Sequence, residues 1–371
     1  MPTISRSSDS TRLVPIWLVL ALLIVISVPK TGLASRKARD PGRATLLALD
    51  DCDDDNDHST PPGGDTVLLL NSEGQLVRKI HGLTVSRSIG GHRAFSVSED
   101  GRSFVICGNS GEGITMYRTS NGIELWSLSG FFQSAVFADG LVYTLGPGGV
   151  YAIDHTGTIV KHSRTGCGID IVFDPLGKCL WIVGMDIKKY SLDLKLQFKV
   201  KLPFGISHGA AFSVDVNPDG SAWIACRNGY GKEGIANQLM KVSPQGRLLR
   251  VIALDFCPQG VRVNISNGSV WTTGRIHRKD YSRIGDEWPD TTAELDALIR
   301  TKVQNHTRKY DSEGRLLVKS TQGGTSIEVN PSDGTVWIAG DKSILHCSST
   351  GDNLATYTGT SGSQKWLAVI P

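Results

Sequence analysis

Short apolar runs alternate with tight polar turns through most of the chain. In the clearest copies, at 171–184, 214–226 and 327–340, an apolar run enters a turn that opens with Asn-Pro or Asp-Pro, and a second run built on Trp-Ile follows. Asn, Asp and glycine are favoured in such turns because they tolerate a backbone with positive φ. A strand-turn-strand unit that recurs along the chain predicts a repeat architecture.

A second kind of hairpin alternates with the first. The turn glycines of the first kind are Gly101, Gly140, Gly177, Gly220, Gly268 and Gly334. Turns of the second kind, most of which read Ser/Asp-x-x-Gly, lie at 71–74, 119–122, 154–157, 243–246, 311–314 and 348–351, with a degenerate copy at 191–194. Successive first-kind glycines are 39, 37, 43, 48 and 66 residues apart. Two hairpins in roughly 40 residues form one four-stranded blade, so the pattern predicts an all-β β-propeller over residues 66–371.

The two ends of this region predict how the ring closes. A second-kind hairpin at 67–80 precedes every first-kind one, and a lone strand at 365–370 follows the last. A ring closes without exposed edges when strands from both termini share one blade. We therefore expect six full blades and a seventh made from both ends of the region. Only three strands can be recognised for this seventh blade, one fewer than a blade needs. A six-bladed ring with an extra terminal hairpin is the alternative.

The longest interval between repeats contains an insertion at about 278–306. Within it, residues 290–303 have the pattern of a capped amphipathic helix. Insertions in propellers fall in loops on one face, so we expect this short helix to cover part of the channel mouth.

The N-terminal region differs from the repeats. An apolar stretch at 13–28 lies between Arg12 and Lys30, and small residues precede Ser35. The stretch is shorter than the roughly 20 residues that a membrane-spanning helix needs, which favours a cleaved signal peptide at 1–34. The alternative is a retained membrane anchor formed by residues 13–29. Either way the sequence predicts a secreted or cell-envelope protein, with a charged linker at 35–65.

Charge and cysteine usage narrow the function classes. The net charge is +3, from 39 basic and 36 acidic residues, and no basic stripe is present, which argues against nucleic-acid binding. None of the seven cysteines has metal-site or redox-motif spacing. Cys107, Cys179, Cys226 and Cys347 lie in strand-like runs, where cysteine usually acts as a small buried hydrophobe.

The units at 217–225 and 239–246 resemble NHL repeats, and equally the repeats of streptogramin-lyase-like propellers. The resemblance covers residues 66–371 and implies a propeller. Streptogramin lyases use histidines and a glutamate with Mg²⁺ near the channel, but no residue set here matches theirs one by one. The resemblance therefore carries no catalytic residue over to this chain.

An acidic cluster at 51–63 in the linker is similar to the Asp-Cys-Asp-Asp repeat assigned to metal binding in exported bacterial proteins. Asp51, Asp53, Asp55 and Asp57 are its candidate ligands for Ca²⁺, which takes six to eight oxygens. The alternative is an acidic, solvated linker that binds no metal.

Chemistry in a propeller is expected at the channel, which the innermost strands line. Aligning the turns places Ser96, Val172, Asp215, Arg262 and Glu328 at equivalent positions of these strands. Because alternate residues of a strand share a facing, we expect the charged members of this set to converge on the channel.

Two interpretations of this convergence remain open. In the first, Asp215 and Glu328 hold a divalent ion (Ca²⁺ or Mg²⁺), Arg262 or His208 completes the site, and the protein is a lyase or hydrolase for a small cyclic substrate. In the second, Arg262 neutralises the two acids and there is no cofactor. The sequence favours the second: a non-catalytic binding module that presents its loops and channel mouth to a ligand or to a protein or glycan partner.

Overall fold

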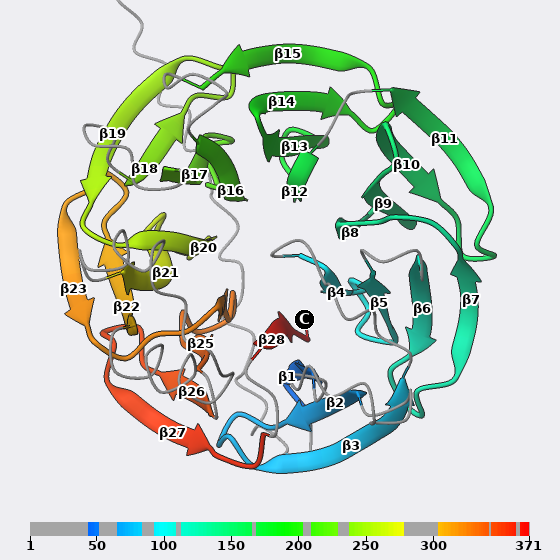
Figure 1. The fold of residues 1–371 in the computed structure, drawn as a ribbon, viewed down its shortest axis with the longest axis horizontal. Helices are drawn as coiled ribbons and strands as arrows, with labels where there is room; N and C mark the ends of the chain where they lie inside the picture. Colours follow the sequence, from blue (N-terminus) through cyan, green and yellow to red (C-terminus); the bar gives the residue numbers. More distant parts are fainter. Residues whose placement is uncertain are drawn as a thin grey trace, which may run out of the picture. The chain divides into compact units, whose positions relative to one another are not determined.

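Seven four-stranded antiparallel sheets are arranged in a ring in the computed structural model (Figure 1). The structure describes residues 44–51, 65–83, 93–108, 113–164, 168–202, 209–228, 237–277, 303–340, 343–360 and 364–370. All of them belong to one compact unit, Pro41–Pro371. The predicted β-propeller is thus confirmed, with seven blades rather than six.

Each of blades 1 to 6 is a continuous meander that runs from the channel to the rim. Blade 1 contains β4 (Phe95–Val97), β5 (Ser103–Cys107), β6 (Ile114–Arg118) and β7 (Glu124–Leu128). Blade 2 contains β8 (Ser134–Ala138), β9 (Leu141–Gly146), β10 (Gly149–Ile153) and β11 (Ile159–Arg164). Blade 3 contains β12 (Gly168–Asp174), β13 (Cys179–Gly184), β14 (Asp186–Ser191) and β15 (Leu196–Lys201).

The second half of the ring repeats this order. Blade 4 contains β16 (Gly209–Val216), β17 (Ala222–Asn228), β18 (Asn237–Val242) and β19 (Leu248–Leu254). Blade 5 contains β20 (Cys257–Val263), β21 (Val270–His277), β22 (Val303–Tyr310) and β23 (Leu316–Ser320). Blade 6 contains β24 (Ser326–Val329), β25 (Val336–Ala339), β26 (Ile344–Cys347) and β27 (Asn353–Tyr357).

Blade 7 is built from both ends of the chain, as predicted. Its strand order is β28 (Gln364–Val369), β1 (Leu46–Asp51), β2 (Asp65–Leu70) and β3 (Leu76–Leu83). The red end of the chain therefore pairs with its blue end in Figure 1. Strand β1 is the one that the sequence count lacked. It lies inside the segment 35–65 predicted as a linker, so the propeller begins earlier than residue 66.

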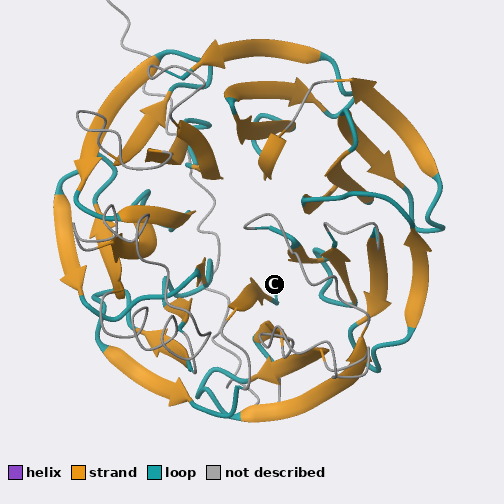
Figure 2. Cartoon of the chain, viewed as in Figure 1, coloured by secondary structure: helices purple, strands orange, loops and turns teal. Residues whose placement is uncertain are grey.

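The described residues form strands and loops only (Figure 2). No helix among them is long and apolar enough to span a membrane. The helix predicted at 290–303 and the signal or anchor segment at 1–34 lie outside the described residues.

The inner turns have the backbone that their residues predict. In blade 4, Gly220 has φ +77° and donates its N–H to the carbonyl of Asn217 at 2.9 Å. The Asp219 carboxylate accepts from the backbone N–H and the hydroxyl of Ser221. A side chain at Gly220 would strain this backbone, which explains why the turn requires glycine.

Buried tryptophans of blades 3 to 6 each pack against the next blade of the ring, which for blade 6 is blade 7. Trp181, Trp223, Trp271 and Trp337 occupy equivalent positions on the second strands, and each is at most 1% exposed. On the third strand, each pairs with a basic residue: Lys189, Lys241, Lys309 and His346, respectively. The His346 ring stacks on Trp337 with centroids 3.9 Å apart.

The three lysines also reach across to the next blade. The ammonium groups of Lys189, Lys241 and Lys309 lie 5.0, 5.7 and 5.3 Å from the ring centroids of their tryptophans. Each donates a hydrogen bond to a backbone carbonyl in the outer turn of the following blade, that of Pro244, Ser312 and Ser349, respectively. We call these contacts the lysine bridges. They join neighbouring blades with charge-assisted hydrogen bonds, which are stronger than neutral ones.

Five cysteines in the described residues are buried and free of disulfides: Cys107, Cys179, Cys226, Cys257 and Cys347. Burial raises the pKa of Cys107 and Cys179 to about 12 and that of Cys347 to about 11. These thiols are protonated at neutral pH, so they act as small apolar side chains.

Candidate functional site

The channel lining follows the register that the repeats imply. Val172, Asp215, Arg262 and Glu328 each lie opposite the tryptophan of their blade's second strand. Ser96 lies opposite Val105 in blade 1. The aligned residues therefore occupy equivalent places on the innermost strands.

Arg262 and Glu328 form an ion pair between blades 5 and 6. The Nε of Arg262 donates to Oε1 of Glu328 at 2.6 Å, and its Nη1 donates to the carbonyl of Val261 at 2.8 Å. The Arg262 side chain is 4% exposed, whereas that of Glu328 is 18% exposed. Glu328 therefore keeps a face open to the channel.

Asp215 makes a different ion pair. Its Oδ1 accepts from Nη2 of Arg93 at 2.7 Å, and its Oδ2 accepts from the backbone N–H of Val263 at 2.7 Å. Arg93 lies two residues before the innermost strand of blade 1, and it also donates to the carbonyl of Val214. This arginine crosses the channel from blade 1 to blade 4.

Sequence reasoning missed Arg93 because the residue has no counterpart in the repeats. The equivalent positions of blades 3 to 6 hold Ile169, Phe212, Gln259 and Thr325. The available signal was an arginine two residues before the Phe95–Val97 strand, and that signal is weak without knowledge of the partner acid across the ring.

Asp170 is buried below these pairs and connects three blades. Its carboxylate accepts from the hydroxyl of Ser134 at 3.1 Å, the hydroxyl of Ser213 at 3.2 Å and the backbone N–H of Val214 at 3.0 Å. Asp170 is 0% exposed. A fully buried carboxylate with several donors is a structural hub, since no face of it remains for a ligand.

The charges in the channel shift each other's protonation. Burial alone would lower the pKa of Arg93, but Asp215, Asp170 and Glu328 raise it above its ordinary value. Burial raises the pKa of Glu328, against the opposing effects of Arg262 and Arg93. Arg93 is therefore a permanent cation, while Glu328 is a carboxylate that takes up a proton more readily than a solvated one.

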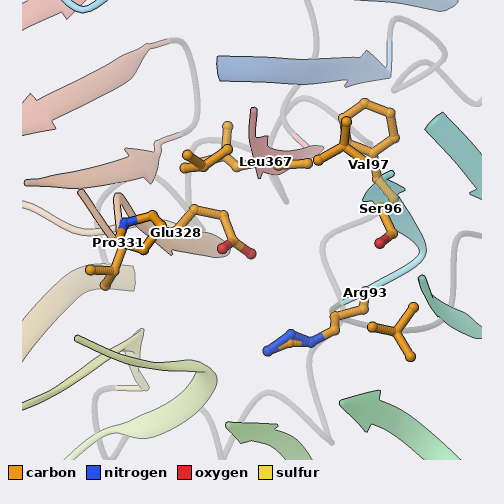
Figure 3. Close-up of a pocket in the computed structure, with 11 residues that line it drawn as sticks. Arg93, Ser96, Val97, Glu328, Pro331 and Leu367 are labelled. Carbon is orange, nitrogen blue, oxygen red and sulfur yellow. The ribbon is translucent and has the colours of Figure 1, made fainter. Parts of the chain in front are cut away.

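A cavity of about 220 Å³ lies between Arg93 and Glu328. Figure 3 shows the two charged groups pointing toward one another from different sides, with Ser96, Val97 and Leu367 around them. The lining comes from β4, β8, β24 and β28, and most of it is apolar. The cavity can therefore receive a small molecule that meets a cation at one side and an anion at the other.

The arrangement does not suit a divalent cation. Asp215 and Glu328 each bind an arginine instead of sharing a common space. Within the described ranges, no group of three or more His, Cys, Asp or Glu residues could hold a metal ion. Of the two acids that Arg262 was expected to neutralise, Glu328 pairs with it, whereas Asp215 pairs with Arg93 instead.

The remaining site residues predicted from the sequence are not among the residues that line the channel cavity. His208 and three of the acidic-cluster residues, Asp53, Asp55 and Asp57, fall outside the described residues. Asp51 is the last residue of β1 and pairs with Gln364 of β28. The metal-binding hypothesis for the cluster stays a prediction.

Comparisons with known proteins bear on the fold. No protein-family model matches the chain, and no curated protein sequence matches it. Among solved structures, a functionally unknown protein from Desulfotomaculum acetoxidans DSM 771 is similar with a TM-score of 0.59 and 10% identity, covering 88% of this chain and 99% of that one.

Two further structures are similar over most of the propeller. Kuenenia stuttgartiensis hydrazine synthase has a TM-score of 0.55 and 13% identity, with 72% of this chain and 79% of that chain covered. A chain of a mitotic checkpoint complex has a TM-score of 0.52 and 12% identity, with 79% and 81% covered. At such identities, these likenesses show the seven-bladed β-propeller fold alone.

Proposed function

We propose that the protein is a non-catalytic binding module that holds a small zwitterionic ligand in the channel cavity. A β-propeller fold is compatible with a binding role, and the role itself is argued from the site. The observation that carries the specific proposal is the opposition of Arg93 and Glu328 across one cavity of about 220 Å³. A ligand anion would pair with Arg93, and a ligand cation with the open face of Glu328.

The apolar part of the lining supports the same ligand class. Phe95, Val97 and Leu367 face the cavity beside the two charges. Charged pairs gain strength where apolar walls exclude water, and they fix a ligand's orientation more than they add affinity. The module would therefore distinguish ligands by the positions of their positive and negative groups.

A catalytic role has less support. A metal-assisted lyase or hydrolase needs Asp215 and Glu328 to share a dication, and both already bind arginines. The raised pKa of Glu328 is typical of functional acids, but burial in an ion-paired network gives the same shift. The binding role therefore explains the site with fewer assumptions.

We also propose that the protein is exported from the cytoplasm. The N-terminal apolar segment at 13–28 supports export, either as a secreted protein or held in the cell envelope by an anchor at 13–29. The Asn-Pro-Asp-Gly and Trp-Ile repeats support a distant relationship to NHL and streptogramin-lyase-like propellers. A protein or glycan partner would contact the loops around the same channel mouth.

The test is calorimetric binding of the twenty free amino acids, each compared with the matched carboxylic acid that lacks the amine. We expect at least one amino acid to bind at least tenfold more tightly than its matched acid. Glu328→Gln should remove that difference, because the ligand amine loses its partner.

Glu313→Gln, which changes an exposed acid in an outer turn of blade 5, is the matched control and should keep the difference. Equal binding of both ligand classes to the unaltered protein would overturn the proposal. Mg²⁺ and Ca²⁺ are titrated in parallel. Divalent binding that Asp215→Asn and Glu328→Gln both abolish would instead support the metal-dependent enzyme.

A further inference from the structure

A second cavity, of about 600 Å³, lies where blade 7 meets blade 1. In the other six blades a tight turn joins the two innermost strands, but in blade 7 these strands are β28 and β1, from opposite ends of the chain. Ile370, just beyond β28, lines this cavity, while its neighbour Val369 lines the channel cavity. The seam cavity is thus a separate space beside the channel site.

The repeat explains why the seam is hollow. In blades 3 to 5 a buried tryptophan pairs with a lysine two residues before the outer turn, and the lysine bridge fills the boundary with the next blade. In blade 7 the equivalent pair is Leu47 and Leu69. Two leucines replace the tryptophan and the lysine, so the space is left open and its floor is apolar.

The walls of the seam cavity carry positive charge. Its eleven lining residues include Arg78, Arg102 and Arg118, and none of the eleven is acidic. Arg78 donates to the backbone carbonyl of Ser120 across the blade boundary. Arg102 contacts Asp100 at 3.7 Å, but both side chains are largely exposed, so this pair is weak.

Arg118 is the most available of these cations. It is exposed, and within the described part of the chain no carboxylate forms an ion pair with it. It lies directly opposite Ser103, in the register that also brings Arg102 close. Arg78 donates to a carbonyl and Arg102 has only a weak surface pair, so Arg118 and Arg102 can both donate to one carboxylate group.

A buried hydroxyl group lies beside the cavity. Thr119 is 7% exposed and lines the cavity, and its Oγ1 is buried without a hydrogen-bond partner. Its backbone N–H is fixed by the carbonyl of Arg102 at 2.8 Å. Buried polar atoms are rarely left unpaired, so this hydroxyl is suited to a ligand oxygen.

We propose that the seam cavity binds a small amphiphilic monoanion, a carboxylate joined to an unbranched apolar chain. The carboxylate would accept hydrogen bonds from Arg118, Arg102 and the Thr119 hydroxyl, since guanidinium groups match the geometry of a carboxylate. The apolar chain would lie on Leu69, Val77 and Ile370. Each methylene buried there is worth roughly a factor of four in affinity.

The test is calorimetric titration with decanoate below its micellar concentration. Acetate, decanol and decyltrimethylammonium are the comparison ligands. We expect decanoate to bind at least tenfold more tightly than each of the three, because only decanoate supplies both the charge and the chain. Equal affinity for decanoate and decanol would overturn the proposal.

Variants separate this site from nonspecific binding. Arg118→Ala combined with Arg102→Ala should weaken decanoate binding at least tenfold, and Thr119→Val should weaken it severalfold. The double change alters exposed side chains, so the fold is retained and the melting temperature should stay within a few degrees.

Arg247→Ala, at an exposed arginine in the outer turn of blade 4, is the matched control and should leave binding unchanged. If the control variant lost as much affinity as the double variant, net charge alone would explain binding and the seam site would be rejected. Glu328→Gln should leave decanoate binding unchanged, which separates a failure here from a failure of the channel proposal.

Discussion

The ammonium group of Lys309 in blade 5 lies 2.6 Å from the carbonyl oxygen of Ser349 in the outer turn of blade 6. The same group faces the ring of Trp271, with 5.3 Å to its centroid. One lysine thus joins an aromatic ring of its own blade to the backbone of the next. The two other lysine bridges repeat this geometry, so blades 3 to 6 are fastened in series.

Lys309→Met should destabilise the protein by about 1 kcal/mol, which is less than a charged hydrogen bond can contribute. Methionine keeps the packing on Trp271 but cannot donate to Ser349. Burial lowers the pKa of Lys309. The cost of burying this charge therefore offsets part of the free energy that the hydrogen bond to Ser349 contributes to stability. Urea unfolding at pH 7 measures the change, with the exposed Lys319→Met as control. A more stable Lys309→Met protein would show that this bridge is not stabilising.

Asp170→Asn should destabilise the protein by about 2 to 4 kcal/mol, because one carboxylate oxygen becomes an NH₂ group that faces other donors. Asp170 accepts from hydroxyls of two neighbouring blades and from the N–H of Val214. Asp193→Asn is the control, since the Asp193 side chain is 70% exposed and forms a surface ion pair with Lys161. Thermal unfolding should separate the two variants clearly. Equal effects would mean that the buried hub adds nothing beyond a surface pair.

Glu328 should make stability depend on pH. Because burial raises its pKa in the folded state, its contribution to stability is fully present below its unfolded pKa of about 4.3 and is lost as pH rises through the folded pKa. Glu328→Gln cannot titrate. Unfolding free energies measured from pH 4 to 8 should therefore show the unaltered protein losing stability relative to the variant as pH rises. A difference that stays constant over this range would contradict the raised pKa.

His306 should contribute acid sensitivity of the opposite kind. The side chain is 4% exposed, and burial together with Arg308 lowers its pKa. Unfolding releases a histidine that binds a proton near pH 6.5, so stability falls as pH drops below about 6.5. His306→Gln should lose this sensitivity, whereas His155→Gln, at an exposed turn histidine, should keep it. Denaturant unfolding at pH 5 and pH 8 provides the comparison.

The five buried cysteines should resist alkylation in the folded protein. Thiolates react, and burial raises the pKa of Cys107, Cys179 and Cys347 and keeps all five side chains away from the reagent. Peptide mapping after iodoacetamide treatment should find Cys107, Cys179 and Cys226 unmodified in buffer and modified in urea. Rapid modification of Cys226 in buffer would show that blade 4 opens.

Local sequence patterns were sufficient to predict the blades. The ion pairs of the channel site could not be predicted in the same way, because some of them join residues from distant blades. Turn glycines such as Gly220 fix hairpins, and their spacing placed Arg262 and Glu328 on neighbouring inner strands. The Asp215–Arg93 pair joins blades 4 and 1, and nothing in a repeat of about 40 residues encodes a partner three blades away. Strand β1 was missed for a related reason, because Leu46–Asp51 has no turn of its own and pairs with the far end of the chain.

The closing sheet also sets an order of events during synthesis. A ribosome delivers Leu46–Asp51 long before Gln364–Val369, so β1 can pair with β2 early but keeps one edge unpaired until β28 has emerged. Contacts between such distant segments form slowly and leave strand edges exposed to wrong partners. Each of blades 1 to 6 is one continuous segment, so its strands can pair as they leave the ribosome, whereas blade 7 can be completed only once β28 has emerged.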